Sequence, residues 1–402
     1  MRTYLNEHNS MADLNSFITR KNNFDDFQDR VDYVIDLDEV FYNYEHDYSQ
    51  DYFTIWALED LTIRFVYPAE FSSASTSGGI ITSLSYSTDE GETWTTENFT
   101  LGQRKDAVLS HMSKGDKILL KGNGEICTDR NNGKYASQFI SSGKFCVSGN
   151  ILSLKYGDNF SNNSQLYMLN YHNFFENKNL VSAEHLVLPS VLADSSITAF
   201  SHCEGMFSGC TSLVAAPSVL PALNMQTGCY MNMFSGCVSL TKAPRILATD
   251  FSTGERCCEG MFSGCISLKT APELLATTLG LRCYASMFSG CTSLVQAPAL
   301  PATTLTERCY NAMFEDCISL TEAPELPATT LTQFCYWGMF EGCWNLSSAR
   351  ILAENISATQ CIDDWLKNVN YTGTLYKKTG VTLTPTVQTA VTVPSGWTVV
   401  DI

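Results

Sequence analysis

The sequence predicts a multidomain chain: an N-terminal helical arm, an all-β sandwich-like domain, and a solenoid of helix–strand repeats that ends in a C-terminal β cap. Three observations lead to this prediction. Negative charge is concentrated in the first segment, and short β-prone runs fill the second. A Met-Phe word then recurs at nearly constant spacing over more than half of the chain.

Residues 1–50 are predicted to form the acidic helical arm. They carry four Lys or Arg and eleven Asp or Glu, so this segment holds −7 of the formal net charge of −17. Apolar residues such as Leu14, Phe17 and Ile18 recur at roughly helical spacing. Two interpretations stay open: an amphipathic helix packed on the next domain, or a docking arm for a partner.

The acidic composition excludes two classes of partner. Nucleic-acid binding needs a basic stripe, and binding to anionic lipid needs clustered cations, whereas the net charge here is −17. No run of about eighteen apolar residues predicts a membrane-spanning helix, and no apolar segment near Met1 predicts a secretory signal. We therefore expect either a trimmed chain or release by a route other than general secretion.

Residues 51–157 are predicted to form a β-sandwich-like domain, because runs such as "FTIWAL", "LTIRFVYP" and "KILLKG" alternate with Gly, Asn, Asp and Ser. The stretch "SYSTDEGETWTT" resembles the Asp-box of sialidase-like propellers through Ser87, Asp89, Gly91 and Trp94. A single copy argues against a propeller. The sequence suggests no pair of carboxylates for glycoside hydrolysis, which argues against a glycosidase. We expect a β-hairpin in which Asp89 accepts turn amides and Trp94 folds back.

Residues 158–375 are predicted to form a solenoid from the spacing of one phenylalanine per repeat. The intervals between successive copies are 27, 28, 26, 26 and 26 residues. This period is typical of a leucine-rich-repeat solenoid, in which each copy pairs a helix with a strand. The phenylalanines are Phe207, Phe234, Phe262, Phe288, Phe314 and Phe340, with a degenerate copy at Phe175.

One copy shows how each repeat is expected to fold. "TLTERCYNAMFEDC" is predicted to be a short helix with Thr306 at its N-cap. "SLTEAPELP" is predicted to be a strand with Leu320 inward that ends at Pro324, since proline cannot donate to a sheet. Residues 376–402 are β-prone and interrupted by Pro and Gly, which predicts a closing cap.

Twelve of the sixteen cysteines fall at two fixed positions of the repeat and so predict two columns along the solenoid. Disulfides, a metal site and buried thiols are all conceivable. Within one helical repeat the two sulfurs would lie about 12 Å apart, too far for a bridge, and zinc usually needs closer pairs. Buried thiols are favoured, which fits folding in a reducing compartment. The columns are Cys229, Cys257, Cys283, Cys309, Cys335, Cys361, and Cys210, Cys237, Cys265, Cys291, Cys317, Cys343.

No catalytic motif is present, so we predict a protein that is not an enzyme and needs no cofactor or metal. The sequence lacks H-E-x-x-H, G-x-S-x-G and P-loop patterns, and its six histidines are scattered. The expected working surface is the outer face of the repeat strands, where residues vary between copies. The candidates are Lys242, Arg245, Lys269, Glu273, Gln296, Thr321, Glu322 and Glu325.

The words "MFSGCTSLVQAPALPATTL" resemble the BspA-like leucine-rich repeats of Bacteroidales over residues 174–360. "STDEGETW" and "VPSGWTVVDI" are similar to the flanking segments of such proteins. The resemblance implies a surface adhesin, and similar β-domain-plus-repeat proteins are also encoded by phages of the same hosts, including crAss-like phages. This chain departs from the cellular adhesins because it shows neither a signal peptide nor a lipid anchor.

The resemblance therefore implies a virion protein of a Bacteroidales phage that is assembled in the host cytosol. We expect residues 1–50 and the β-domain to bind capsid or tail proteins. We expect the repeats to act as decoration or fibre and to touch host-surface or mucosal glycans. A homo-oligomer is compatible with this prediction. The alternative is a bacterial cell-surface adhesin.

Overall fold

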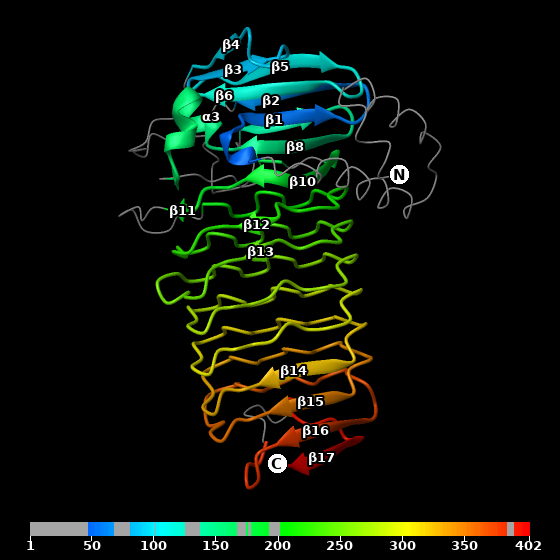
Figure 1. The fold of residues 1–402 in the computed structure, drawn as a ribbon. Helices are drawn as coiled ribbons and strands as arrows, with labels where there is room; N and C mark the ends of the chain where they lie inside the picture. Colours follow the sequence, from blue (N-terminus) through cyan, green and yellow to red (C-terminus); the bar gives the residue numbers. More distant parts are fainter. Residues whose placement is uncertain are drawn as a thin grey trace, which may run out of the picture.

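The computed structural model describes residues 47–67, 81–100, 102–124, 137–166, 174–175, 178–192, 202–383 and 390–402. It is mostly β, with very little helix and a solenoid of about seven turns that follows the β-domain (Figure 1). The predicted helical arm lies outside the described residues except for its last four, which include the 3-10 helix η1 (Tyr48–Gln50).

The β-domain contains two sheets. One has the strand order β10-β8-β1-β6-β3-β4, and the other has the order β5-β2-β7. All pairs are antiparallel except β10 with β8, which is parallel. The strands are β1 (Phe53–Ala57), β2 (Leu61–Tyr67), β3 (Ser83–Ser87), β4 (Thr95–Asn98), β5 (Lys105–Met112), β6 (Lys117–Gly122), β7 (Gln138–Ser141), β8 (Phe145–Asn150) and β10 (Leu180–Val187).

Aromatic side chains join the two sheets into a sandwich. Phe139 of β7 lies with its ring centroid 5.6 Å from that of Phe53 on β1 and 5.0 Å from that of Phe65 on β2. All three are fully buried. A short helix, α3 (Ser153–Tyr156), and a 3-10 helix, η2 (Gly157–Asn162), follow β8. The inward-facing apolar residues of alternating strands thus build the core that the sequence pattern predicts.

The sandwich and the solenoid share one sheet and one core. Strand β10 pairs with β8 on one side, and its Ser182 forms a bridge with Ala215 of the following turn. A single buried cluster extends from Phe53 in the sandwich to Trp397 near the C-terminus. The solenoid therefore continues the edge of the β-domain (Figure 1).

The strands of the solenoid stack in parallel and lie on one side of it. Pairs include β12 with β13 and the ladder β14-β15-β16-β17. These strands are β9 (Gln165–Leu166), β11 (Val191–Leu192), β12 (Val219–Leu220), β13 (Arg245–Ile246), β14 (Glu322–Leu326), β15 (Ser348–Ile351), β16 (Gly373–Lys377) and β17 (Trp397–Asp401).

The predicted end of the repeat strand at Pro324 is wrong. Strand β14 runs through this proline, and its pairing with β15 shifts in register between Glu322 and Glu325. A local irregularity lets the strand tolerate a residue that has no N–H to donate. Leu320 is fully buried, as the pattern predicts.

The predicted helix in each repeat is also wrong. In the copy around Cys309, alternate amides donate to the next turn: Tyr310 to the carbonyl of Cys335, and Ala312 to that of Trp337. The amides between them donate three residues back, as Met313 does to Tyr310. A helix would use every amide within its own segment, whereas this arrangement uses half of them to join neighbouring copies.

The backbone of this segment, which we call the turn segment, repeats every four residues. Arg308, Ala312 and Asp316 have φ angles of 57°, 50° and 57°, so a left-handed residue recurs at each fourth position. Four is close to the 3.6 residues of a helical turn. Cys309 and Cys317 therefore still share the buried face that helical spacing predicts.

The C-terminal segment closes the last turn. Strand β17 extends the parallel sheet by one strand, and the indole N–H of Trp397 donates to the carbonyl of Asn370 at 2.8 Å. Trp365 is fully buried, and its indole N–H donates to the carbonyl of Thr392 at 2.6 Å. Two tryptophans thus cover the end of the apolar interior, which a solenoid requires.

Candidate functional site

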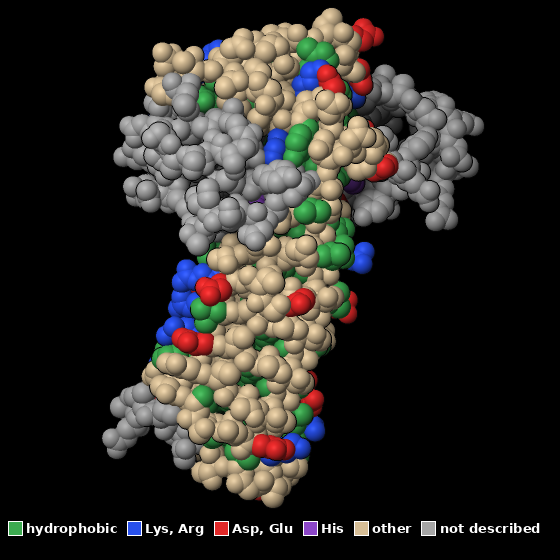
Figure 2. Space-filling view, turned by 90° about the vertical axis from the view of Figure 1, so that its left-hand side faces the viewer, with side chains coloured by type: hydrophobic (Ala, Val, Ile, Leu, Met, Phe, Trp, Pro, Cys, Tyr) green, Lys and Arg blue, Asp and Glu red, His purple; other side chains and the backbone are tan. Residues whose placement is uncertain are grey.

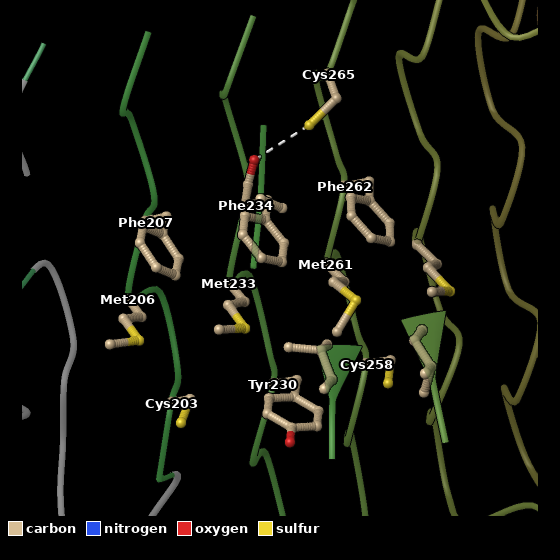
Figure 3. Close-up of a cluster of buried hydrophobic side chains, with 14 of the residues drawn as sticks. Cys203, Met206, Phe207, Tyr230, Met233, Phe234, Cys258, Met261, Phe262 and Cys265 are labelled. Carbon is tan, nitrogen blue, oxygen red and sulfur yellow. Dashed lines mark hydrogen bonds between the residues drawn. The ribbon is translucent and has the colours of Figure 1, made fainter. Parts of the chain in front are cut away.

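A column of stacked phenylalanines forms the centre of the solenoid. From Phe175 to Phe340, neighbouring ring centroids lie 5.2–5.6 Å apart with interplanar angles of 2–7°. Trp365 ends the column at 6.4 Å with a tilt of 58°. Figure 3 shows Phe207, Phe234 and Phe262 in this stack above a parallel row of methionines. Each copy therefore places the same side chain on the same side chain of its neighbour.

The second cysteine column carries a repeated thiol hydrogen bond. The S–H of Cys265 donates to the carbonyl of Phe234 in the preceding turn at 3.2 Å (Figure 3). That carbonyl also accepts the N–H of Cys237 in its own turn. Equivalent thiol bonds of 3.0–3.1 Å occur for Cys237, Cys291, Cys317 and Cys343.

The first cysteine column is also buried, but its thiols lack the repeated acceptor of the second column. The thiol of Cys229 lies 3.9 Å from the carbonyl of Cys257, and that of Cys335 lies 3.7 Å from the carbonyl of Cys361. The thiol of Cys257 lies 3.5 Å from the carbonyl of Gln226, and that of Cys361 lies 3.3 Å from the carbonyl of Ile356. The acceptor differs between copies, so packing is the role that the members share. Thr306, the predicted helix cap, instead donates its hydroxyl to Gly280 of the preceding turn at 2.8 Å.

Burial keeps the thiols protonated. It raises the pKa of Cys309 and of Cys343 to about 12, and that of Cys317 well above the ordinary thiol value. A thiol nucleophile or metal ligand acts as the thiolate. All fifteen described cysteines are free, and no group of three potential metal ligands occurs among the described residues. The columns accordingly offer structure rather than reactivity.

His202 and Cys203 are adjacent in the sequence, and the structure buries both in the first complete turn. Burial raises the pKa of Cys203 to about 12, so its thiol holds its proton at neutral pH. Within the repeat, Cys203 takes the place that Tyr230 holds in the next turn (Figure 3). This pair therefore provides packing for the end of the column.

The Asp-box residues hold a hairpin together. Asp89 accepts the amide and the hydroxyl of Thr93 at 2.9 and 2.5 Å and the hydroxyl of Ser87 at 2.7 Å. These bonds, those from Thr93 first, lower the pKa of Asp89 to about 2. Gly91 has a φ of +91°, and the indole N–H of Trp94 donates to its carbonyl at 3.1 Å. The carboxylate is fully engaged within the turn between β3 and β4.

All eight residues predicted for the outer sheet face are exposed: Lys242, Arg245, Lys269, Glu273, Gln296, Thr321, Glu322 and Glu325. The strand ladder places them in rows along one side of the solenoid. Ion pairs cross between neighbouring strands there, including that of Lys377 with Asp401. Lys242 binds Glu184, and Arg350 binds Glu325 with 2.9 Å between Nε and Oε2.

Sequence reasoning missed three residues on or beside these surfaces. Glu184 is an acid that is almost completely buried under the exposed ammonium group of Lys242. Trp344 and Tyr371 are 66% and 92% exposed near the far end of the solenoid. Trp344 follows a column cysteine at a position that holds Val, Ile or Thr in other copies, and this contrast in the sequence could have revealed it.

The face of the solenoid seen in Figure 2 carries few charges. Figure 2 shows one side of the solenoid, on which small groups of Lys, Arg, Asp and Glu stand among uncharged polar side chains and backbone. Within the described part of the chain, no helix is long and apolar enough to cross a bilayer.

Comparison with known proteins adds no assignment. No family model matches the chain, and searches of curated proteins and of solved structures also find no match.

The thiol columns predict a loss of stability in alkali. The unfolded chain loses a thiol proton near pH 9, whereas folded Cys309, with its pKa of about 12, keeps it. Its stabilisation is fully present below about pH 9 and is lost as the pH rises toward 12. Each such thiol should lower the free energy of unfolding by about 1.4 kcal/mol per pH unit in this window.

Urea unfolding between about pH 8 and about pH 10.5 measures this slope. The Cys309→Ala variant should show a slope that is shallower by about 1.4 kcal/mol per pH unit. The control Ile266→Ala, at an exposed position, should keep the slope of the parent protein. Equal slopes for the parent and Cys309→Ala would show that the buried thiol is not linked to folding.

Proposed function

We propose that this protein is a non-enzymatic structural protein of a Bacteroidales phage particle, a decoration or fibre that presents the solenoid for adhesion. Its N-terminal region and sandwich would bind other virion proteins. The observation that carries the proposal is the continuous sheet that joins the sandwich to the solenoid through β8 and β10. This shared sheet would hold the surface of the solenoid in a fixed orientation relative to the β-domain.

The division between constant and variable positions supports a role in adhesion. The interior repeats Met, Phe, Cys and Leu in every full copy, while the exposed strand positions differ. A frame of this kind can change its contacts without changing its core. Thr270, Gln296 and Glu322, which occupy one repeat position in successive turns, illustrate the variation on the proposed contact face.

The state of the cysteines favours a particle assembled in a cytosol over a secreted adhesin. The thiols of Cys237, Cys265 and Cys291 act as hydrogen-bond donors, which requires the reduced form. Reducing conditions prevail in cytosol, whereas secreted proteins fold where disulfides form. A bacterial cell-surface adhesin is the second candidate, because the BspA-like repeat words resemble such proteins.

Location distinguishes the two candidates. We expect mass spectrometry of gradient-purified phage particles to find this protein in constant ratio to the major capsid protein. Immunogold labelling should place it on the particle. A washed, uninfected Bacteroidales cell culture that carries the protein on its envelope, with none in particles, would favour the adhesin and refute the virion proposal.

The sheet face is expected to make the adhesive contact. A variant with Gln296→Ala, Glu322→Ala and Glu325→Ala should bind host cells about tenfold more weakly, because a few residues carry most of the binding energy of an interface. A matched control with Thr303→Ala and Thr329→Ala, which changes exposed residues outside the strand rows, should bind like the parent. Flow cytometry of host cells incubated with fluorescently labelled parent, variant or control protein measures the binding. Equal binding by all three proteins would exclude this face as the contact.

A further inference from the structure

Three arginines occupy the same repeat position in successive turns: Arg256, Arg282 and Arg308. They lie in the turn segment, where Arg282 donates its backbone N–H to Glu307 and Arg256 donates to Leu281. Because hydrogen-bonded turns lie about 5 Å apart, the three side chains start from adjacent points of one column. We call this set the arginine ladder.

The backbone at this position is one that arginine seldom adopts. The three φ angles are 56°, 57° and 57°, in the left-handed region that favours glycine. The preceding turn has Gly228 there, with a φ of 64°. The two turns after Arg308 place Phe334 and Gln360 there, with φ angles of 55° and 50°. The left-handed backbone therefore belongs to the turn segment in general, and what distinguishes these three turns is the arginine side chain.

The outer two arginines have partners. Arg256 Nε lies 3.3 Å from Oε2 of Glu259, and Arg308 Nη1 lies 2.9 Å from Oε1 of Glu307. The guanidinium carbon of Arg308 also lies 4.3 Å from the ring centroid of Phe334. Both cations are thus at least partly neutralised.

The central arginine has no such partner. The two positions that supply a glutamate to its neighbours are Leu281 and Ala285 in its own turn. Arg282 Nε is buried and makes no hydrogen bond with any described residue, and no ion pair to Arg282 forms among them. A buried N–H of a cation without an acceptor is costly. The described residues around Arg282 therefore supply no carboxylate for its guanidinium group.

We propose that the arginine ladder is an oxyanion-binding site centred on Arg282, which takes a sulfate, phosphate or carboxylate group of a ligand. Arginine presents two parallel N–H donors that match two oxygens of such a group. Arg256 and Arg308 would flank the bound anion and stabilise it electrostatically. The formal charge of −17 excludes general attraction of anions, so recognition depends on this local arrangement. The proposal stands independently of the phage assignment.

Isothermal titration with sodium sulfate, sodium phosphate and sodium acetate tests the site, with sodium chloride added to hold ionic strength constant. The parent protein should bind at least one of these anions. The anion that binds most tightly identifies the chemical group that a natural ligand carries. Arg282→Gln should weaken that binding by about tenfold, since it removes a charge-assisted, two-point contact.

Two control variants make the outcome decisive. Arg104→Gln removes an exposed arginine of the β-domain that belongs to neither proposed surface and should leave the affinity unchanged. Arg282→Lys keeps the charge but loses the paired donors, so its affinity should lie between those of the parent and Arg282→Gln. Circular dichroism checks that each variant is folded. Absence of binding by the parent, or equal losses in Arg282→Gln and Arg104→Gln, would overturn the proposal.

Discussion

The solenoid depends on how its amides are shared. Every second N–H of the turn segment donates to the next copy, as Tyr310 does to Cys335, and the amides between them close turns within the copy. This pattern fixes the register between neighbours, so like residues lie on like residues. The phenylalanine column with spacings of 5.2–5.6 Å and the thiol column follow from that register. The carbonyl of Phe262 accepts both the N–H of Cys265 and the thiol of Cys291, which ties two turns through one group.

The sequence predicted the stacking but not the backbone that produces it. A period of 26–28 residues identified the solenoid, and spacing by four residues correctly placed Cys309, Met313 and Cys317 on one buried face. The same spacing wrongly indicated a helix, because a left-handed residue at each fourth position gives nearly the same periodicity. Gly209, Gly236 and Gly264, aligned in successive copies with φ angles of 73–74°, mark one of these left-handed positions in the sequence. The non-glycine residues at equivalent positions, such as Arg308, hid the pattern.

The surfaces were predictable to different degrees. The candidates on the strand rows follow from their variation between copies of the repeat, so Lys242, Glu273 and Glu325 could be predicted from the sequence and are exposed. The buried partner Glu184 could not be named, since it comes from β10 at the junction with the sandwich, 58 residues before Lys242. The arginine ladder was equally hidden, because its significance lies in the missing carboxylate around Arg282. A constant interior thus supports two distinct exposed surfaces, one on the strands and one on the turn segment.

The central claim is that reduced thiols are structural parts of the solenoid, and their oxidation state tests it most directly. The protein can be unfolded without reductant, alkylated and analysed by mass spectrometry, beside a native sample treated in the same way. We expect all fifteen described cysteines to be alkylated after unfolding, and only the partly exposed Cys146 among them to react in the native protein. Column cysteines that become alkylated only after reductant is added would show disulfides and contradict the account.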